Sequence, residues 1–145
     1  MGIKKFLNKE QQLVIVQAIT DAEKATSGEI RVHLDSSCDG DVLDNAVYIF
    51  KKLKMHKTAL RNGVLIYLAV DDRKFAILGD VGINTKVPEG FWDQIKENMA
   101  ENFAKGDFAT GLTQGIRMVG DRLKMYFPTM ANDKNELSNE ISFGS

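Results

Sequence analysis

Hydrophobic residues recur at helical spacing in four segments of the chain. Because a surface helix turns one apolar stripe toward the core, this spacing predicts four helices. The first is expected from about Asn8 to Ala25. The four stripes are Leu13, Val16, Ile19 and Ala22; Val42, Leu43, Ala46, Ile49, Phe50 and Leu53; Phe91, Ile95, Met99 and Phe103; and Phe108, Leu112, Ile116, Val119, Leu123 and Phe127.

Capping residues mark where these helices begin. Asn8 is followed three residues later by Gln11, the pattern of a capping box, and Gly28 is a stop signal after the first helix. The other predicted starts are Asp39 or Asp41, Pro88 and Asp107.

Three further segments have the patterns of strands. Residues 29–34 alternate strictly, which predicts a half-exposed strand at a sheet edge with Glu29, Arg31 and His33 facing outward. Residues 63–70 are almost continuously apolar, as in a central strand covered on both faces. A short polar break separates this segment from residues 75–78, which predicts an antiparallel hairpin. The first two strands are joined by a helix and should be parallel.

These elements describe an α/β domain with a small mixed sheet. We find no repeat or low-complexity linker before residue 128, so residues 1–128 should form one folding unit. Residues 129–145 read as a polar tail, mobile or docked along the surface, with Ile141 and Phe143 as its anchors.

Composition narrows the functional classes. With 145 residues, 43% apolar residues and a formal net charge of -1, the chain gives no electrostatic reason to expect a nucleic-acid ligand. It has neither the apolar core of a secretory signal nor a run of about 18 apolar residues that could span a membrane. Its single cysteine, Cys38, cannot form an internal disulfide. We therefore expect a cytoplasmic monomer.

Carboxylates follow the predicted strands at one edge of the sheet. Asp35 follows the first strand and Asp71 and Asp72 follow the second, so the three should meet at the carboxyl ends of the parallel pair, where ligands of open α/β sheets bind. The third helix should return toward this edge and bring Asp107 near it. Clustered carboxylates favour a neutralising cation, and hard oxygen ligands suit Ca²⁺ or Mg²⁺. The alternative is a solvated hairpin turn.

The opposite edge gathers Glu29, Arg61, Asn62 and Asp80. They form either an Arg–carboxylate brace, with Asn62 holding a turn, or a second ion or anion site. His33 could act as an acid or base near neutral pH, or it is an ordinary exposed or packed histidine.

Five short motifs together resemble a known family. They are Thr26-Ser27-Gly28-Glu29-Ile30-Arg31-Val32, Arg61-Asn62-Gly63-Val64-Leu65-Ile66-Tyr67, Asp72-Arg73-Lys74, Ile77-Leu78-Gly79-Asp80-Val81-Gly82-Ile83 and Gly106-Asp107-Phe108. Their order and spacing resemble the TPM domain, named for a thylakoid lumen protein, a photosystem II repair protein and a nematode receptor modulator. The end of the chain, Asn135-Glu136-Leu137 and Ser142-Phe143-Gly144, is similar to stand-alone bacterial members.

The resemblance implies a three-layer α/β/α sandwich and two functional hypotheses. Bacterial members are linked to divalent-metal binding, which favours a cation-binding module that regulates or contacts an unidentified protein partner. The thylakoid branch is described as an acid phosphatase, which makes a metal-dependent phosphomonoesterase the alternative. In that alternative a cation held by Asp71, Asp72 and Asp35 would activate water, and Arg73 would stabilise phosphate charge.

Overall fold

Strand β2 (Gly63–Ala69) lies in the middle of a four-stranded sheet with the order β3-β2-β1-β4. The computed structural model describes residues 3–130 and 135–144. Strands β1 (Glu29–Asp35) and β2 are parallel, whereas β3 (Lys74–Gly79) runs antiparallel to β2. The mixed sheet predicted from the sequence is thus confirmed. The last strand, β4 (Ser142–Phe143), pairs parallel to β1 at the other edge.

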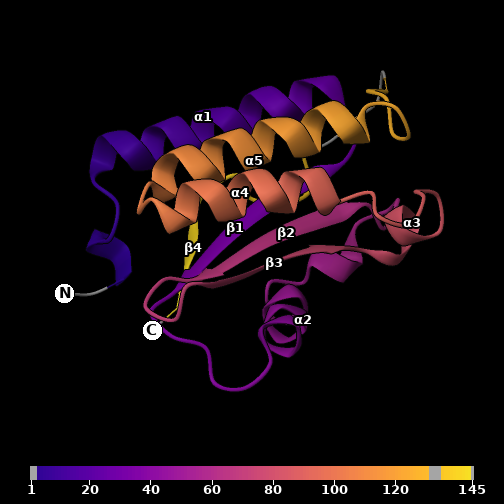
Figure 1. Ribbon diagram of the computed structural model, residues 1–145. Coiled ribbons are helices and arrows are strands. Elements are labelled where there is room, and N and C mark those ends of the chain that lie inside the picture. Colours follow the sequence, from indigo (N-terminus) through magenta and orange to yellow (C-terminus); the bar gives the residue numbers. More distant parts are fainter. Residues whose placement is uncertain (1–2, 131–134, 145) are drawn as a thin grey trace.

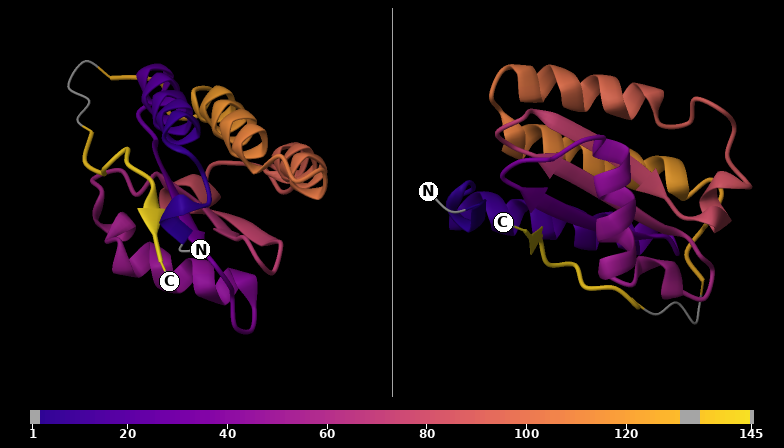
Figure 2. Two further views of the ribbon diagram at one scale, coloured as in Figure 1. Left: turned by 90° about the vertical axis from the view of Figure 1, so that its left-hand side faces the viewer. Right: turned by 90° about the horizontal axis from the view of Figure 1, so that it is seen from below.

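Helices cover both faces of this sheet and make a three-layer α/β/α sandwich (Figures 1 and 2). Helices α1, α4 and α5 form the layer on one face, and α2 lies on the other. The helices are α1 (Lys9–Ala25), α2 (Val42–Lys52), α3 (Val81–Asn84), α4 (Asp93–Ala104) and α5 (Phe108–Leu123), with short 3-10 turns at Ile3–Lys5 and Met55–Lys57.

All seven residues of β2 are buried, because its side chains alternate between two hydrophobic cores. Val64, Ile66 and Leu68 enter the larger core under α1, α4 and α5. Leu65 and Tyr67 enter the smaller core under α2. The continuous apolar pattern of this segment therefore predicted its place correctly.

The predicted helix starts are largely confirmed. Asn8 and Gln11 form a reciprocal capping box at α1, Asp41 caps α2, and Asp107 caps α5. The third predicted start is wrong, since α4 begins at Asp93 rather than near Pro88. Residues 88–92 instead make turns that place Phe91 in the larger core. The short helix α3 was not expected, because Gly82 lies inside it and glycine is a poor helix former.

Two predicted core residues are exposed. Leu13 is 69% exposed and Leu43 is 49% exposed, because the buried faces of α1 and α2 are rotated away from them. The buried residues of α1 are Ile15, Ala18 and Ile19, which keep the same spacing in another phase. Residues 13–16 are all apolar, so periodicity alone could not choose the phase.

The outward face predicted for β1 is also wrong. Glu29 is 3% exposed and His33 is 4% exposed, because the chain end covers them. The backbone amide of Leu137 donates to Glu29 Oε1 at 2.6 Å, and Ser142 lies against His33. In the described residues the tail is docked along β1; its positions 131–134 and 145 lie outside the described part.

None of the helices in the described residues combines the length and the apolar character that a bilayer crossing requires.

Replacing Ile66 with Ala should lower the free energy of unfolding by about 2–5 kcal/mol, because Ile66 is fully buried in β2 and truncation leaves a cavity. Leu13→Ala is the matched control and should change stability by less than about 0.5 kcal/mol, because Leu13 is mostly exposed. Urea denaturation of both variants measures the difference. Equal losses would contradict the assignment of the two side chains to core and surface.

Candidate functional site

Two loops meet at the carboxyl ends of β1 and β2. The Asp71 amide donates to the Ser36 carbonyl at 2.8 Å, and the Cys38 amide donates to Asp72 Oδ2 at 2.7 Å. The Val70 amide donates to the Asp35 carbonyl at 2.9 Å. These three bonds hold the loop after β1 against the β2–β3 turn, so Asp35, Asp71 and Asp72 lie at the same end of the sheet, as their positions in the sequence predicted.

The three carboxylates have different surroundings. Asp35 accepts from the Tyr67 hydroxyl at 2.7 Å and contacts His33 Nε2 at 3.0 Å, so both of its oxygens have partners. Asp72 is exposed and uses one oxygen to bind the opposite loop. Asp71 is exposed, and within the described part of the chain its carboxylate accepts no hydrogen bond.

Asp107 lies in a different layer. It caps α5 by accepting from the Thr110 amide at 3.2 Å. The turn between α4 and α5 is at the same end of the molecule as the β2–β3 turn (Figure 1). However, Asp35 binds Tyr67, whose side chain belongs to the core under α2, on the other face of the sheet. Asp107 therefore shares the end of the molecule with Asp35 but not its environment.

The described residues include no group of three or more His, Cys, Asp and Glu side chains arranged to hold a metal ion. Ca²⁺ takes six to eight oxygen ligands, so in these residues backbone or amide carbonyls and water would have to supply most of them. Asp71 and Asp72 still fit a partly hydrated ion, since Mg²⁺ commonly keeps several waters and binds only one or two carboxylates. Metal binding by any of the four aspartates stays a prediction.

His33 is the centre of a buried hydrogen-bonded chain. Its Nδ1 lies 2.8 Å from Ser142 Oγ and its Nε2 lies 3.0 Å from Asp35 Oδ1. A carboxylate only accepts, so Nε2 carries the proton and Nδ1 accepts from the Ser142 hydroxyl. The ring also stacks on Tyr67 with centroids 5.8 Å apart. His33 was interpreted either as an acid or base or as an ordinary exposed or packed histidine, and its burial agrees with a packed histidine.

Burial sets the protonation states of His33 and Tyr67, the two groups that donate hydrogen bonds to Asp35. The pKa of His33 is lowered, chiefly by burial; the hydrogen bond and charge of Asp35 oppose this lowering, and the charges of Lys52 and Arg31 add to it. Burial, followed by the bond to Asp35, raises the pKa of the Tyr67 hydroxyl above its ordinary value. At neutral pH a neutral imidazole and a protonated phenol therefore both donate to Asp35.

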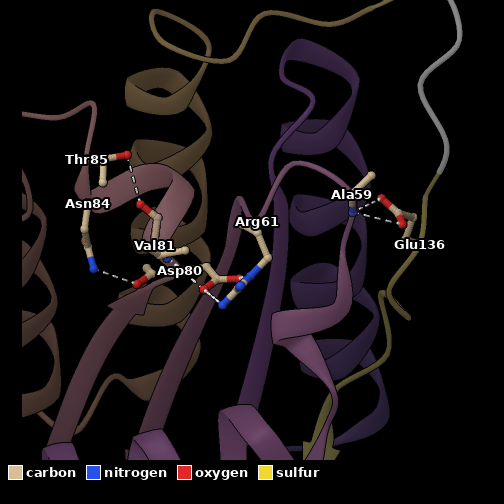
Figure 3. Close-up of polar contacts among 8 residues, drawn as sticks. Ala59, Arg61, Asp80, Val81, Asn84, Thr85 and Glu136 are labelled. Atoms are coloured by element: carbon tan, nitrogen blue, oxygen red, sulfur yellow. Dashed lines mark hydrogen bonds and ion pairs between the residues drawn. The ribbon is translucent and has the colours of Figure 1, made fainter.

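The opposite end of the sheet is braced by an ion pair (Figure 3). Arg61 Nε and Nη2 each donate to one oxygen of Asp80 at 2.8 Å, and Asp80 also accepts from the Val81 amide to cap α3. Asp80 is 94% buried and hydrogen bonding to it raises the pKa of Arg61. The Arg–carboxylate brace predicted as one alternative is the observed arrangement.

Close backbone packing supports the brace. Arg61 has a φ of 51°, and its carbonyl accepts from the Gly82 amide at 2.9 Å. A Cβ atom at Gly82 would overlap the carbonyl oxygens of Leu60 and Arg61, so only glycine fits there. Asn62 is 98% buried; its side chain contacts Ser27 Oγ at 3.4 Å and its carbonyl accepts from the Glu29 amide at 3.3 Å. At this end of the sheet, the side chains of Arg61, Asn62 and Asp80 are thus engaged in contacts within the protein.

Comparison with protein-family models gives one match, the TPM domain, over residues 3–122. The chain belongs to the TPM domain family. This is the family that the five motifs resemble.

Solved structures similar to this TPM domain agree with its fold. The NMR structure of the BA42 protein from the psychrophilic bacterium Bizionia argentinensis is 49% identical, with a TM-score of 0.92 and 98% of each chain covered. The N-terminal domain of the cg2496 protein from Corynebacterium glutamicum is 19% identical, with a TM-score of 0.65 and coverage of 81% of this chain and 74% of that one.

A third similar structure is the N-terminal domain of a P. gingivalis protein, which is 22% identical with a TM-score of 0.68 and covers 84% of this chain and 79% of its own. The last two show the fold alone. A search of curated protein sequences found no match.

The stability of this TPM domain should fall as the pH drops below about 6.5, the ordinary pKa of histidine. His33 has a lowered pKa when folded, so the unfolded chain binds more protons below that pH and protonation favours unfolding. The effect disappears about one pH unit above 6.5, where His33 is neutral in both the folded and the unfolded chain. Chemical denaturation between pH 5 and 8 measures the change.

The variant His33→Gln should lose most of this pH dependence between pH 5 and 7. His56→Gln is the matched control, since it removes the only other histidine, and it should keep the dependence of the unaltered chain. If His33→Gln and the unaltered chain decline in parallel, His33 is not the group responsible.

Proposed function

We propose that this TPM domain binds a divalent cation between the loop after β1 and the β2–β3 turn, and that the domain acts as a regulatory or protein-interaction module. Asp71 and Asp72 would supply the carboxylate ligands and water would complete the shell. The observation that carries the proposal is the pair of hydrogen bonds joining the two loops, Asp71 amide to Ser36 carbonyl and Cys38 amide to Asp72. These two hydrogen bonds hold the β2–β3 turn, which carries the two exposed and adjacent carboxylates, against the loop after β1.

The electrostatics of this turn favour a cation. Asp71 and Asp72 are neighbours in sequence and both exposed, so their like charges repel and a bound cation would relieve that repulsion. Arg73 follows them on the same turn and Lys74 begins β3, and these two residues offset part of the negative charge. Asp35 lies at the same end of the sheet, and its two oxygens are bound by His33 and Tyr67. A site with few protein ligands and good access to water suits Mg²⁺, which keeps several of its bound waters. Ca²⁺ takes more ligands and would also need backbone carbonyl oxygens of the two loops.

The phosphatase alternative depends on Arg73. This residue follows the two aspartates on the same turn, is exposed, and forms no ion pair with a carboxylate of the described residues. A guanidinium beside a bound cation could hold a phosphate group. His33 is a poor general base for such chemistry because it is buried and donates to Asp35. The interaction role is therefore the first proposal.

Replacing both Asp71 and Asp72 with Asn should weaken Mg²⁺ and Ca²⁺ binding at least tenfold in calorimetric titration, because the variant removes both charges and keeps the side-chain shape. Asp107→Asn is the matched control, since Asn also caps helices, and should bind as the unaltered chain does. Equal affinity of the double variant and the unaltered chain would contradict the proposed site.

The same proteins separate the two functions. A Mg²⁺-dependent hydrolysis of p-nitrophenyl phosphate that is lost in Arg73→Ala and in the double variant would establish the phosphatase. Cation binding without phosphate hydrolysis would support the regulatory or protein-interaction module.

A further inference from the structure

The described end of the tail, residues 135–144, lies along the outer edge of β1. Two register pairs join it to the sheet, His33 with Ser142 and Leu34 with Phe143, although β1 is seven residues long. The Gly144 amide adds a bond to the Leu34 carbonyl at 2.9 Å. Toward the start of β1, the tail is held through side chains, by Glu29 at Leu137 and by Arg31 at the Glu140 carbonyl.

Each position at the end of the tail meets a specific requirement. Ser142 donates to His33 Nδ1, while Ile141 and Phe143 point to the other face and pack on the larger core. At Gly144 a Cβ atom would overlap the Asp35 carboxylate and lie 3.0 Å from His33 Nε2. The edge of β1 therefore selects an apolar residue, a hydroxyl residue, an aromatic residue and a glycine, in that order.

The tail does not fill all of the space beside the edge of β1. A groove of about 330 Å³ lies between α1 and the tail. It is lined by Leu13 and Val16 of α1 and by Ile141 and Phe143 of the tail. The Leu13 side chain, which lines this groove, is 69% exposed, and Ile141 and Phe143 are only partly buried. A strand with a larger apolar side chain at the position of Ile141 would bury more of this groove.

We propose that the outer edge of β1 is a recognition site for an extended peptide of a partner protein, and that Ile141–Gly144 is its built-in competing occupant. The partner segment would add parallel to β1 with the pattern large apolar, Ser or Thr, aromatic, Gly. Backbone pairing supplies affinity in such strand addition and the alternating side chains supply specificity. The inference rests on the interaction role proposed above and does not require the cation.

The test uses the full chain carrying Gly144→Val, whose added side chain collides with Asp35 and unseats the tail. Fluorescent peptides of residues 135–144 are titrated against it in EDTA, which separates this result from any failure of cation binding. We expect saturable binding, at least tenfold tighter than to the unaltered chain, whose own tail competes. The chain variant Met125→Val is the matched control, because Met125 is 74% exposed and lies outside residues 135–144, and it should bind as weakly as the unaltered chain.

Changes in the peptide test its recognition. The substitution Ile141→Trp in the peptide should tighten binding by filling the groove, and Gly144→Val in the peptide should weaken it at least tenfold. A tail that stays docked in the Gly144→Val chain, no binding at millimolar peptide, or indifference to the peptide glycine would overturn the proposal.

Amide exchange of the unaltered chain is an independent test if the variant does not fold. The Gly144 amide hydrogen should exchange at least tenfold faster than the Val70 amide, which is bonded to Asp35 in the body of the domain. Equal exchange rates would show that the tail is not released separately and would overturn the proposal.

Discussion

Burial of β2 on both faces is the constraint on which the rest of this structure depends. A strand with no exposed residue needs a helical layer above and below it, and a hydrogen-bonded strand on each side. The parallel crossover supplies β1 and places α2 under one face, and the hairpin supplies β3. The three long helices then close the larger core. This arrangement sends the loops that carry charged residues to the two ends of the sheet.

The two ends differ in chemistry. At the amino ends of β1 and β2, Asp80, Asn62 and Glu29 are nearly fully buried and engaged with the chain itself. At the carboxyl ends, Asp71 and Asp72 are exposed on a turn held by the opposite loop. The first end stabilises the connections between strands; the second has ligand groups that face solvent. His33 connects this second end to the tail.

Patterns local in sequence predicted most of the fold. Continuous apolarity located β2, and the Asn8–Gln11 spacing predicted the capping box of α1. Topology also predicted that Asp35, Asp71 and Asp72 share one end. The burial of His33 could not be predicted, because its partner Ser142 is 109 residues away along the chain. The alternation of Ile141, Ser142 and Phe143 was a signal for an added strand, but a two-residue strand is too short for pattern analysis.

Helix phase and side-chain face explain the remaining differences. Leu13 lies in an apolar run whose buried side depends on how α1 packs on α5, which is a tertiary property. Asp107 was placed at the correct end of the molecule by helix direction, but direction does not determine the layer in which a capping carboxylate lies.

The central claim is that the exposed end of the sheet, and not the braced end, takes a divalent cation. The most direct test is to titrate the unaltered, isotope-labelled chain with Mg²⁺ and with Ca²⁺ and to follow each backbone amide by NMR. The account predicts saturable shifts centred on residues 36–40 and 70–73. Shifts centred on Glu29, Arg61 and Asp80, or no shift at millimolar ion, would contradict it.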